Sequence, residues 1–188
     1  MKNKILILTA LIALFLVQLF VPFSMISDRE NVLEQGKEFR FKTAPIDPVD
    51  PFRGNYLTLS FDANDFAVSS KGDWKENETI YVKLKTDSLG FAVIESVMKD
   101  EPESVNDYVK ARITYIYDRE NQLILNIEYP FDRYYMDEFK AANSTKVYTE
   151  HANDSLYPAY AIVSVYNGES VLKDVIVGGK SIKMWIQK

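Results

Sequence analysis

The chain contains no cysteine and only one histidine, His151, among its 188 residues. The absence of cysteine excludes disulfide bonds, thiolate nucleophiles and zinc sites built from cysteine. One histidine is too few for a His-rich metal site, and any Ser-His-Asp triad would need His151 as its base. We therefore predict no metal site, and the sequence suggests no cofactor.

Positive charge is also scarce, with 22 Lys and Arg against 27 Asp and Glu and a net charge of −5. No basic run occurs, so the electrostatic attraction that nucleic-acid binding requires is missing. We predict no nucleic-acid partner. The chain is 47% hydrophobic and 26% charged, which indicates one globular domain with a short additional segment.

One long hydrophobic run stands at the amino terminus, where residues 5–26 form 22 positions without a charge. A helix of that length, at about 1.5 Å per residue, crosses a hydrocarbon core of roughly 30 Å. The alternative is a cleaved secretory signal, which has a shorter apolar core followed by small residues. Residues 21–27 are mostly bulky, so the sequence favours an uncleaved anchor.

The charges flanking this run predict its orientation. Lys2 and Lys4 precede it, whereas Asp28 and Glu30 follow it. Excess positive charge stays on the cytoplasmic side, so the remainder of the chain is expected outside. We predict a single-pass protein of the cytoplasmic (inner) membrane with four parts: a cytoplasmic tip (1–4), a transmembrane anchor (5–26), a linker (27–35) and an extracytoplasmic domain (36–188).

Beyond the anchor, apolar and polar residues alternate with the two-residue period of β-strands. In 79–86, Ile80, Val82 and Leu84 define one apolar face. Strand patterns occur at 38–42, 56–61, 79–86, 91–98, 108–117, 122–129, 160–166, 171–177 and 181–186. We predict a mainly β, β-rich α+β fold, an antiparallel sandwich or barrel.

Two local signals refine this fold. Turn residues stand between strand patterns at 118–121, 167–168 and 178–179, and predict hairpins, with a meander in the last third of the chain. Apolar residues recur at three- and four-residue spacing in 131–151, which predicts a short helical insertion that includes Tyr135.

The most unusual segment is 44–61, Ala-Pro-Ile-Asp-Pro-Val-Asp-Pro-Phe-Arg-Gly-Asn-Tyr-Leu-Thr-Leu-Ser-Phe. Its three closely spaced prolines stiffen the chain in an extended form. An aspartate and an arginine three residues apart can form a charged hydrogen bond. Two interpretations remain open, a brace for the following strand or a binding surface. The candidate binding residues are Asp47, Asp50, Arg53, Gly54, Asn55 and Tyr56.

Residues 54–61 resemble the octapeptide that gives the GDYXXLXY family its name. Asp-Arg-Tyr-Tyr at 132–135 and Val-Ile-Val-Gly-Gly-Lys at 175–180 are similar to two further blocks of that family. Asn55 stands where the octapeptide has aspartate, and Phe61 where it has tyrosine. The resemblance implies a membrane-anchored bacterial envelope protein of unknown function. It implies no reaction, and the loss of a hydroxyl at Phe61 fits a packing role.

Two classes of function remain. The first is a non-catalytic interaction module that binds a membrane or periplasmic protein through the Pro-Asp-rich loop and the strand after it. The second is an anchored envelope hydrolase or carbohydrate-binding domain that uses Asp47, Asp50 and Arg53. A serine-lysine hydrolase would require Ser24 with Lys83 or Lys85. Because no nucleophile and base are assembled in the sequence, the interaction module is favoured.

Overall fold

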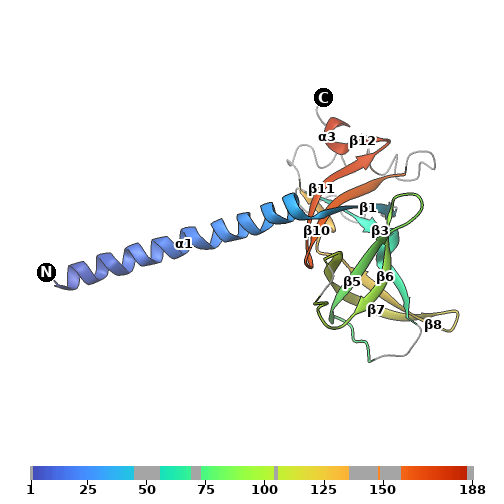
Figure 1. Ribbon diagram of the computed structural model, residues 1–188, viewed down its shortest axis with the longest axis horizontal. Helices are drawn as coiled ribbons and strands as arrows, with labels where there is room; N and C mark the ends of the chain where they lie inside the picture. The colour runs from blue at the N-terminus through green and yellow to red at the C-terminus, as the bar shows by residue number, and fades with distance from the viewer. Residues whose placement is uncertain are drawn as a thin grey trace.

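The computed structural model of the protein describes residues 2–44, 56–68, 73–103, 106–135, 148 and 158–185. One long helix, α1, leads into a body of β-strands, and its amino-terminal end lies far from that body (Figure 1). The described strands form two five-stranded sheets and one two-stranded ribbon.

Helix α1 spans Lys2–Gln35, which is about 51 Å at 1.5 Å per residue. Residues Ile7–Gln35 include a window apolar enough to cross a membrane, and no part of that window is buried in the protein. Pro22 lies inside the helix, as membrane-spanning helices tolerate. The segment 27–35, predicted as a linker, forms the last turns of the same helix.

The carboxyl end of α1 is fixed to the body. Val32 is only 3% exposed. The Val32 carbonyl accepts hydrogen bonds from the Gly36 amide at 3.0 Å and from the Ser164 hydroxyl at 2.7 Å. Helix and body are therefore joined by packing and by hydrogen bonds, and the joint lies at the first residues of the body.

The first sheet runs, in spatial order, β12 (Lys180–Ser181), β11 (Glu169–Val177), β10 (Tyr160–Tyr166), β1 (Lys37–Ala44) and β3 (Ser60–Phe61). The second runs β4 (Asp65–Val68), β8 (Gln122–Glu128), β7 (Tyr108–Arg119), β5 (Thr79–Thr86) and β6 (Ala92–Met98). Strand β2 (Tyr56–Thr58) pairs with β9 (Arg133–Tyr135). Neighbouring strands are antiparallel throughout these three groups.

The two large sheets meet at several places, among them the following two. The 3-10 helix η1 (Asp62–Asn64) connects β3 of the first sheet to β4 of the second. At the turn between β10 and β11, Gly168 accepts a hydrogen bond from the Lys110 amide at 2.9 Å and donates one to the Tyr108 carbonyl at 3.2 Å. The strands therefore form a nearly closed, barrel-like body, and the predicted mainly β fold is confirmed.

The predicted hairpin turns are present. Both central residues have positive φ at Glu120-Asn121 (53° and 64°), Asn167-Gly168 (48° and 82°) and Gly178-Gly179 (57° and 74°). This backbone geometry is that of type I′ turns, whose twist matches antiparallel strands. The meander β10-β11-β12 follows from two of them.

The core of the body is rich in aromatic rings. The Phe41 ring centroid lies 5.4 Å from those of Phe61 and Tyr129, and 4.9 Å from that of Phe131. The three phenylalanines and Tyr129 are at most 3% exposed. Edge-on contacts of this kind add to the burial of large apolar surfaces. In β5, Ile80, Val82 and Leu84 face this core, as their alternation predicts.

Several elements differ from the prediction. Strands β4 and β9 were not predicted, and Tyr135 lies in β9 rather than in a helix. The rest of the predicted insertion, apart from Tyr148, lies outside the described residues. Helix α3 (Ile182–Trp185) replaces most of the strand predicted at 181–186. Its turn is held back against β11 because the Trp185 indole donates a hydrogen bond to the Val177 carbonyl at 3.1 Å.

Candidate functional site

Only one of the candidate binding residues belongs to the described part of the chain. Asp47, Asp50, Arg53, Gly54 and Asn55 lie outside the described residues. Tyr56 is the first residue of β2. The structure therefore locates the strand that follows the Pro-Asp-rich loop.

Strand β2 brings the octapeptide beside the block at 132–135. In the ribbon Tyr56 lies opposite Tyr135, Leu57 opposite Tyr134, and Thr58 opposite Arg133. Leu57 and Tyr134 are 3% and 7% exposed and point into the body. The flanking residues of each strand point to the other face because side chains alternate along a strand.

The outward face of the ribbon carries a small cluster formed by Tyr56, Arg133 and Tyr135. The two tyrosine ring centroids are 5.5 Å apart, and the Arg133 guanidinium carbon lies 5.2 Å from the Tyr56 centroid. A hydrogen bond to Tyr135 and the charge of Asp132 raise the pKa of Arg133, so it remains a cation. Tyr135 is 68% exposed. A cation over an aromatic face and an uncovered ring thus meet at the surface.

Asp174 of β11, which directly precedes the third sequence block, reaches the same region. One carboxylate oxygen of Asp174 accepts hydrogen bonds from the Tyr134 hydroxyl at 3.3 Å and from the Ser181 hydroxyl at 3.0 Å. Burial and the Asp174 charge raise the pKa of Tyr134, which therefore keeps its proton. These contacts tie β9 to β11 and β12, so the three sequence blocks converge at one part of the body.

The rest of the octapeptide is structural. Leu59 and Phe61 are 4% and 3% exposed. The Leu59 amide donates a hydrogen bond to the Asp132 carbonyl at 2.7 Å. Phe61 lies within the aromatic core, 5.4 Å from the Phe131 centroid. The position that lacks the tyrosine hydroxyl is therefore a packing position in this chain.

The serine-lysine alternative finds no support among the described contacts. The Ser24 hydroxyl donates to the Val21 carbonyl within α1 at 3.1 Å. Lys83 forms an ion pair with Glu95 at 2.7 Å, and this pair lowers the pKa of Glu95. Ser24 and Lys83 are thus each engaged with other groups.

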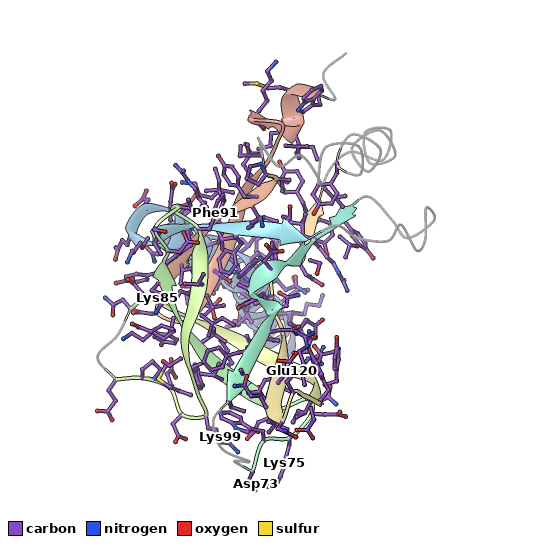
Figure 2. The ribbon with its side chains drawn as sticks, turned by 90° about the vertical axis from the view of Figure 1, so that its right-hand side faces the viewer. Asp73, Lys75, Lys85, Phe91, Lys99 and Glu120 are labelled. Carbon is purple, nitrogen blue, oxygen red and sulfur yellow. The ribbon has the colours of Figure 1, made fainter. Side chains whose placement is uncertain are left out.

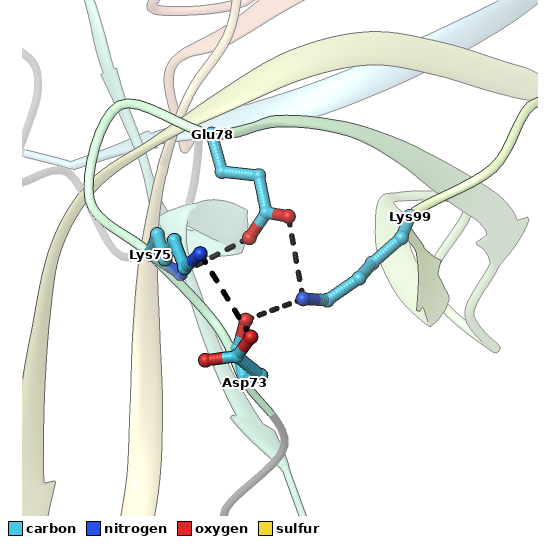
Figure 3. A network of polar contacts seen from close by, with 4 residues as sticks. All are labelled: Asp73, Lys75, Glu78 and Lys99. Atoms are coloured by element: carbon cyan, nitrogen blue, oxygen red, sulfur yellow. Dashed lines mark hydrogen bonds and ion pairs between the residues drawn. The ribbon is translucent and has the colours of Figure 1, made fainter.

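A second polar group is formed by Asp73, Lys75, Glu78 and Lys99. Asp73, Lys75 and Lys99 lie at the bottom of the view in Figure 2. The Lys99 ammonium lies 3.3 Å from Glu78 and donates to the Asp73 carbonyl, and the Lys75 amide donates to Glu78 at 3.0 Å (Figure 3). Two acids balance two lysines. This network braces the segment before β5 against the end of β6 and leaves no charge in excess.

Sequence reasoning missed Arg133, Tyr135 and Asp174 as members of the site. The first two stand in a block quoted for its resemblance, and their position beside Tyr56 follows from a strand pairing that no local pattern predicts. For Asp174 no sequence signal exists. Its role depends on the approach of β9 to β11.

The fold and the converging blocks define a protein with one membrane-spanning candidate helix and a barrel-like β body. The chain belongs to the GDYXXLXY family, whose model matches residues 18–175. No curated protein and no solved structure matches the chain.

Proposed function

We propose that the protein is a non-catalytic interaction module, held by α1 in the cytoplasmic membrane with its amino terminus inside, and that its extracytoplasmic body binds a membrane or periplasmic protein. The binding surface is the Tyr56-Arg133-Tyr135 cluster together with the Pro-Asp-rich loop that precedes Tyr56. The charges flanking the anchor support this orientation.

The observation that carries the proposal is the chemistry of the cluster. Tyrosine and arginine are enriched in protein interfaces because they cover a large contact area and also offer hydrogen bonds. Tyr135 is 68% exposed, although its neighbour Tyr134 is buried. The cluster also stands on a ribbon that is tied to the body by Asp174, so little ordering is needed on binding.

The test is site-specific photocrosslinking in the native membrane. A photoreactive phenylalanine replaces Tyr135 in the full-length chain, and Tyr115, 48% exposed on β7, receives the same replacement as a control. We expect one defined protein adduct from position 135 and none of that mass from position 115. The adduct should be lost in the Arg133→Ala background, since Arg133 contributes the cation of the cluster.

Absence of a protein adduct at position 135, or the same adduct from both positions, would contradict the proposal. Mass spectrometry of the adduct identifies the partner. The topology is tested separately, by proteolysis of spheroplasts and of inverted vesicles. Digestion of the body only in the inverted vesicles would refute the proposed orientation.

A further inference from the structure

A hollow of about 350 Å³ interrupts the wall of the barrel next to the end of β8. Strand β8 pairs with β7 as far as Glu128, opposite Arg112, and then leaves it. Two residues earlier on β7, the Lys110 amide donates a hydrogen bond to the Gly168 carbonyl, so the β10–β11 turn lies beside β7 there in place of β8. The hollow lies between these two partners of β7, with Lys110, Arg112, Glu128, Asp132 and Glu169 among its lining residues.

The hollow lies close to the level along α1 at which the apolar run 5–26 ends. Arg29 of α1 forms an ion pair with Glu169 at 3.6 Å and donates a hydrogen bond to the Ser170 carbonyl at 2.8 Å. Arg29 follows the last residue of the run, Ile26, by about 4.5 Å of helix rise. The headgroup layer is roughly 5 to 7 Å thick on each side of the bilayer. In a membrane, the Glu169 rim is therefore at headgroup level.

This height is set by the fold. Val32 packs into the body, and its carbonyl accepts bonds from both Gly36 and Ser164, so the body cannot swing away from the helix freely. In Figure 1 the β10–β11 hairpin turns beside β7, on the side of the body from which α1 departs. The height of the hollow relative to the bilayer surface is thus fixed by the attachment of the body to α1.

The lining offers one cation without a described partner and two carboxylates, Asp132 and Glu169, whose distances to arginine nitrogens exceed hydrogen-bond length. Arg112 and Glu128 form an ion pair with each other. Lys110 is exposed, and within the described part of the chain its ammonium has no hydrogen-bond or ion-pair partner. The Asp132 side chain is 30% exposed and lies 3.8 Å from Arg133, beyond hydrogen-bond distance. Burial raises the pKa of Asp132, the charge of Arg133 opposes this shift, and the charge of Glu128 adds to it, so a further cation would stabilise the ionised carboxylate.

We propose that this hollow binds the headgroup of a phospholipid that carries both a phosphate and a primary ammonium, of the phosphatidylethanolamine class. Lys110 binds the phosphate, and Asp132 accepts hydrogen bonds from the ammonium group. A hollow of this volume is of the size that small ligands occupy in proteins. A ligand with both charges matches Lys110 and the loosely paired carboxylates, whereas a purely anionic headgroup would face Glu128, Asp132 and Glu169 with no cation of its own. The proposal does not depend on the protein partner.

The test uses the full-length protein in nanodiscs that contain equal parts of phosphatidylethanolamine, phosphatidylcholine and phosphatidylglycerol. After transfer into detergent, the lipids that remain bound are counted by native mass spectrometry. We expect retained phosphatidylethanolamine over both other lipids. Lys110→Ala and Asp132→Asn should each weaken this preference about tenfold or more. The first removes a charged hydrogen bond to the phosphate, and the second removes the negative charge that faces the ammonium. Lys85→Ala, an exposed lysine of β5 outside this hollow, is the control and should leave the preference unchanged.

Equal retention of the three lipids would overturn the proposal, and so would preferential retention of phosphatidylglycerol or an equal effect of Lys85→Ala. Dissolved O-phosphoethanolamine distinguishes the source of the ligand. If it displaces the lipid at millimolar concentration, the hollow is a site for a soluble compound and the lipid assignment is wrong. Circular dichroism of each variant checks that the fold is intact. We expect it to be, because Lys110 and Lys85 make no described side-chain contact that the fold needs and Asp132→Asn keeps the size of the side chain.

Discussion

Replacing Gly36 with alanine should loosen the joint between α1 and the barrel. A Cβ at this position would lie 2.3 Å from the Val32 carbonyl oxygen and 2.4 Å from the Ser164 hydroxyl. Gly36 has no positive φ, so the cost comes from space and not from backbone strain. Moving both oxygens breaks two hydrogen bonds at about 0.5–1.5 kcal/mol each. With partial exposure of Val32, the total loss should be about 2–4 kcal/mol.

The assay is urea unfolding of the full chain in detergent micelles, followed by tryptophan fluorescence. At roughly 2–4 °C per kcal/mol for a chain of this size, the melting temperature should also fall by about 5–15 °C. Gly90→Ala is the matched control. Gly90 has a φ of +86° but no atom within 4 Å of an added Cβ, so only a strain of about 1–2 kcal/mol applies. A Gly36→Ala variant within about 0.5 kcal/mol of the parent chain would refute the account of the joint.

Three further outcomes follow from the described contacts. Phe61→Ala should cost about 3–5 kcal/mol in urea unfolding because it empties part of the aromatic core, whereas Tyr135→Ala on the surface should cost less than about 1 kcal/mol. Burial raises the pKa of both Tyr108 and Tyr148 from 10.0 to about 12. The folded state therefore keeps protons that the unfolded chain loses, and stability should fall as the pH rises from about 10 to about 12, with a smaller slope in Tyr108→Phe; titration at 295 nm that shows all tyrosines ionising together near pH 10 would contradict this. Lys99→Ala should change stability by less than about 1 kcal/mol, since Lys99 and Glu78 both remain in contact with solvent, and a larger loss would mean that the network in Figure 3 is essential for folding.

The fold could be predicted wherever local chemistry decides it. The alternation in β5 and the residues at the three hairpin turns depend on side chains that are neighbours in the sequence. The apolar run predicts the helix for the same reason, but not its continuation to Gln35, because residues 27–35 are polar and are held in place by Val32 and the body.

The site was less accessible from the sequence because it depends on distant pairings. Strand β9 contains three residues, too few for a clear alternation. It is held in place because Tyr134 pairs with Leu57 of β2 and donates a hydrogen bond to Asp174. The helical spacing therefore misassigned Tyr135, whereas Tyr148, the other described residue of the predicted insertion, is helical. The resemblance of separate blocks indicated which segments matter, whereas only the structure shows that two of them share a ribbon.

The order of synthesis has a consequence for the pairing of β1. Its first residue, Lys37, lies opposite Val165, and its last paired residue with β10, Lys42, lies opposite Tyr160. When α1 emerges from the ribosome, the strand that completes the first sheet is still untranslated. Long sequence separations of this kind slow folding. With the orientation proposed above, the chain crosses the bilayer before its body closes. The edge of β1 that pairs with β10 then stays unpaired until the last strands arrive, and chaperones that shield extended chains should associate with it during this interval.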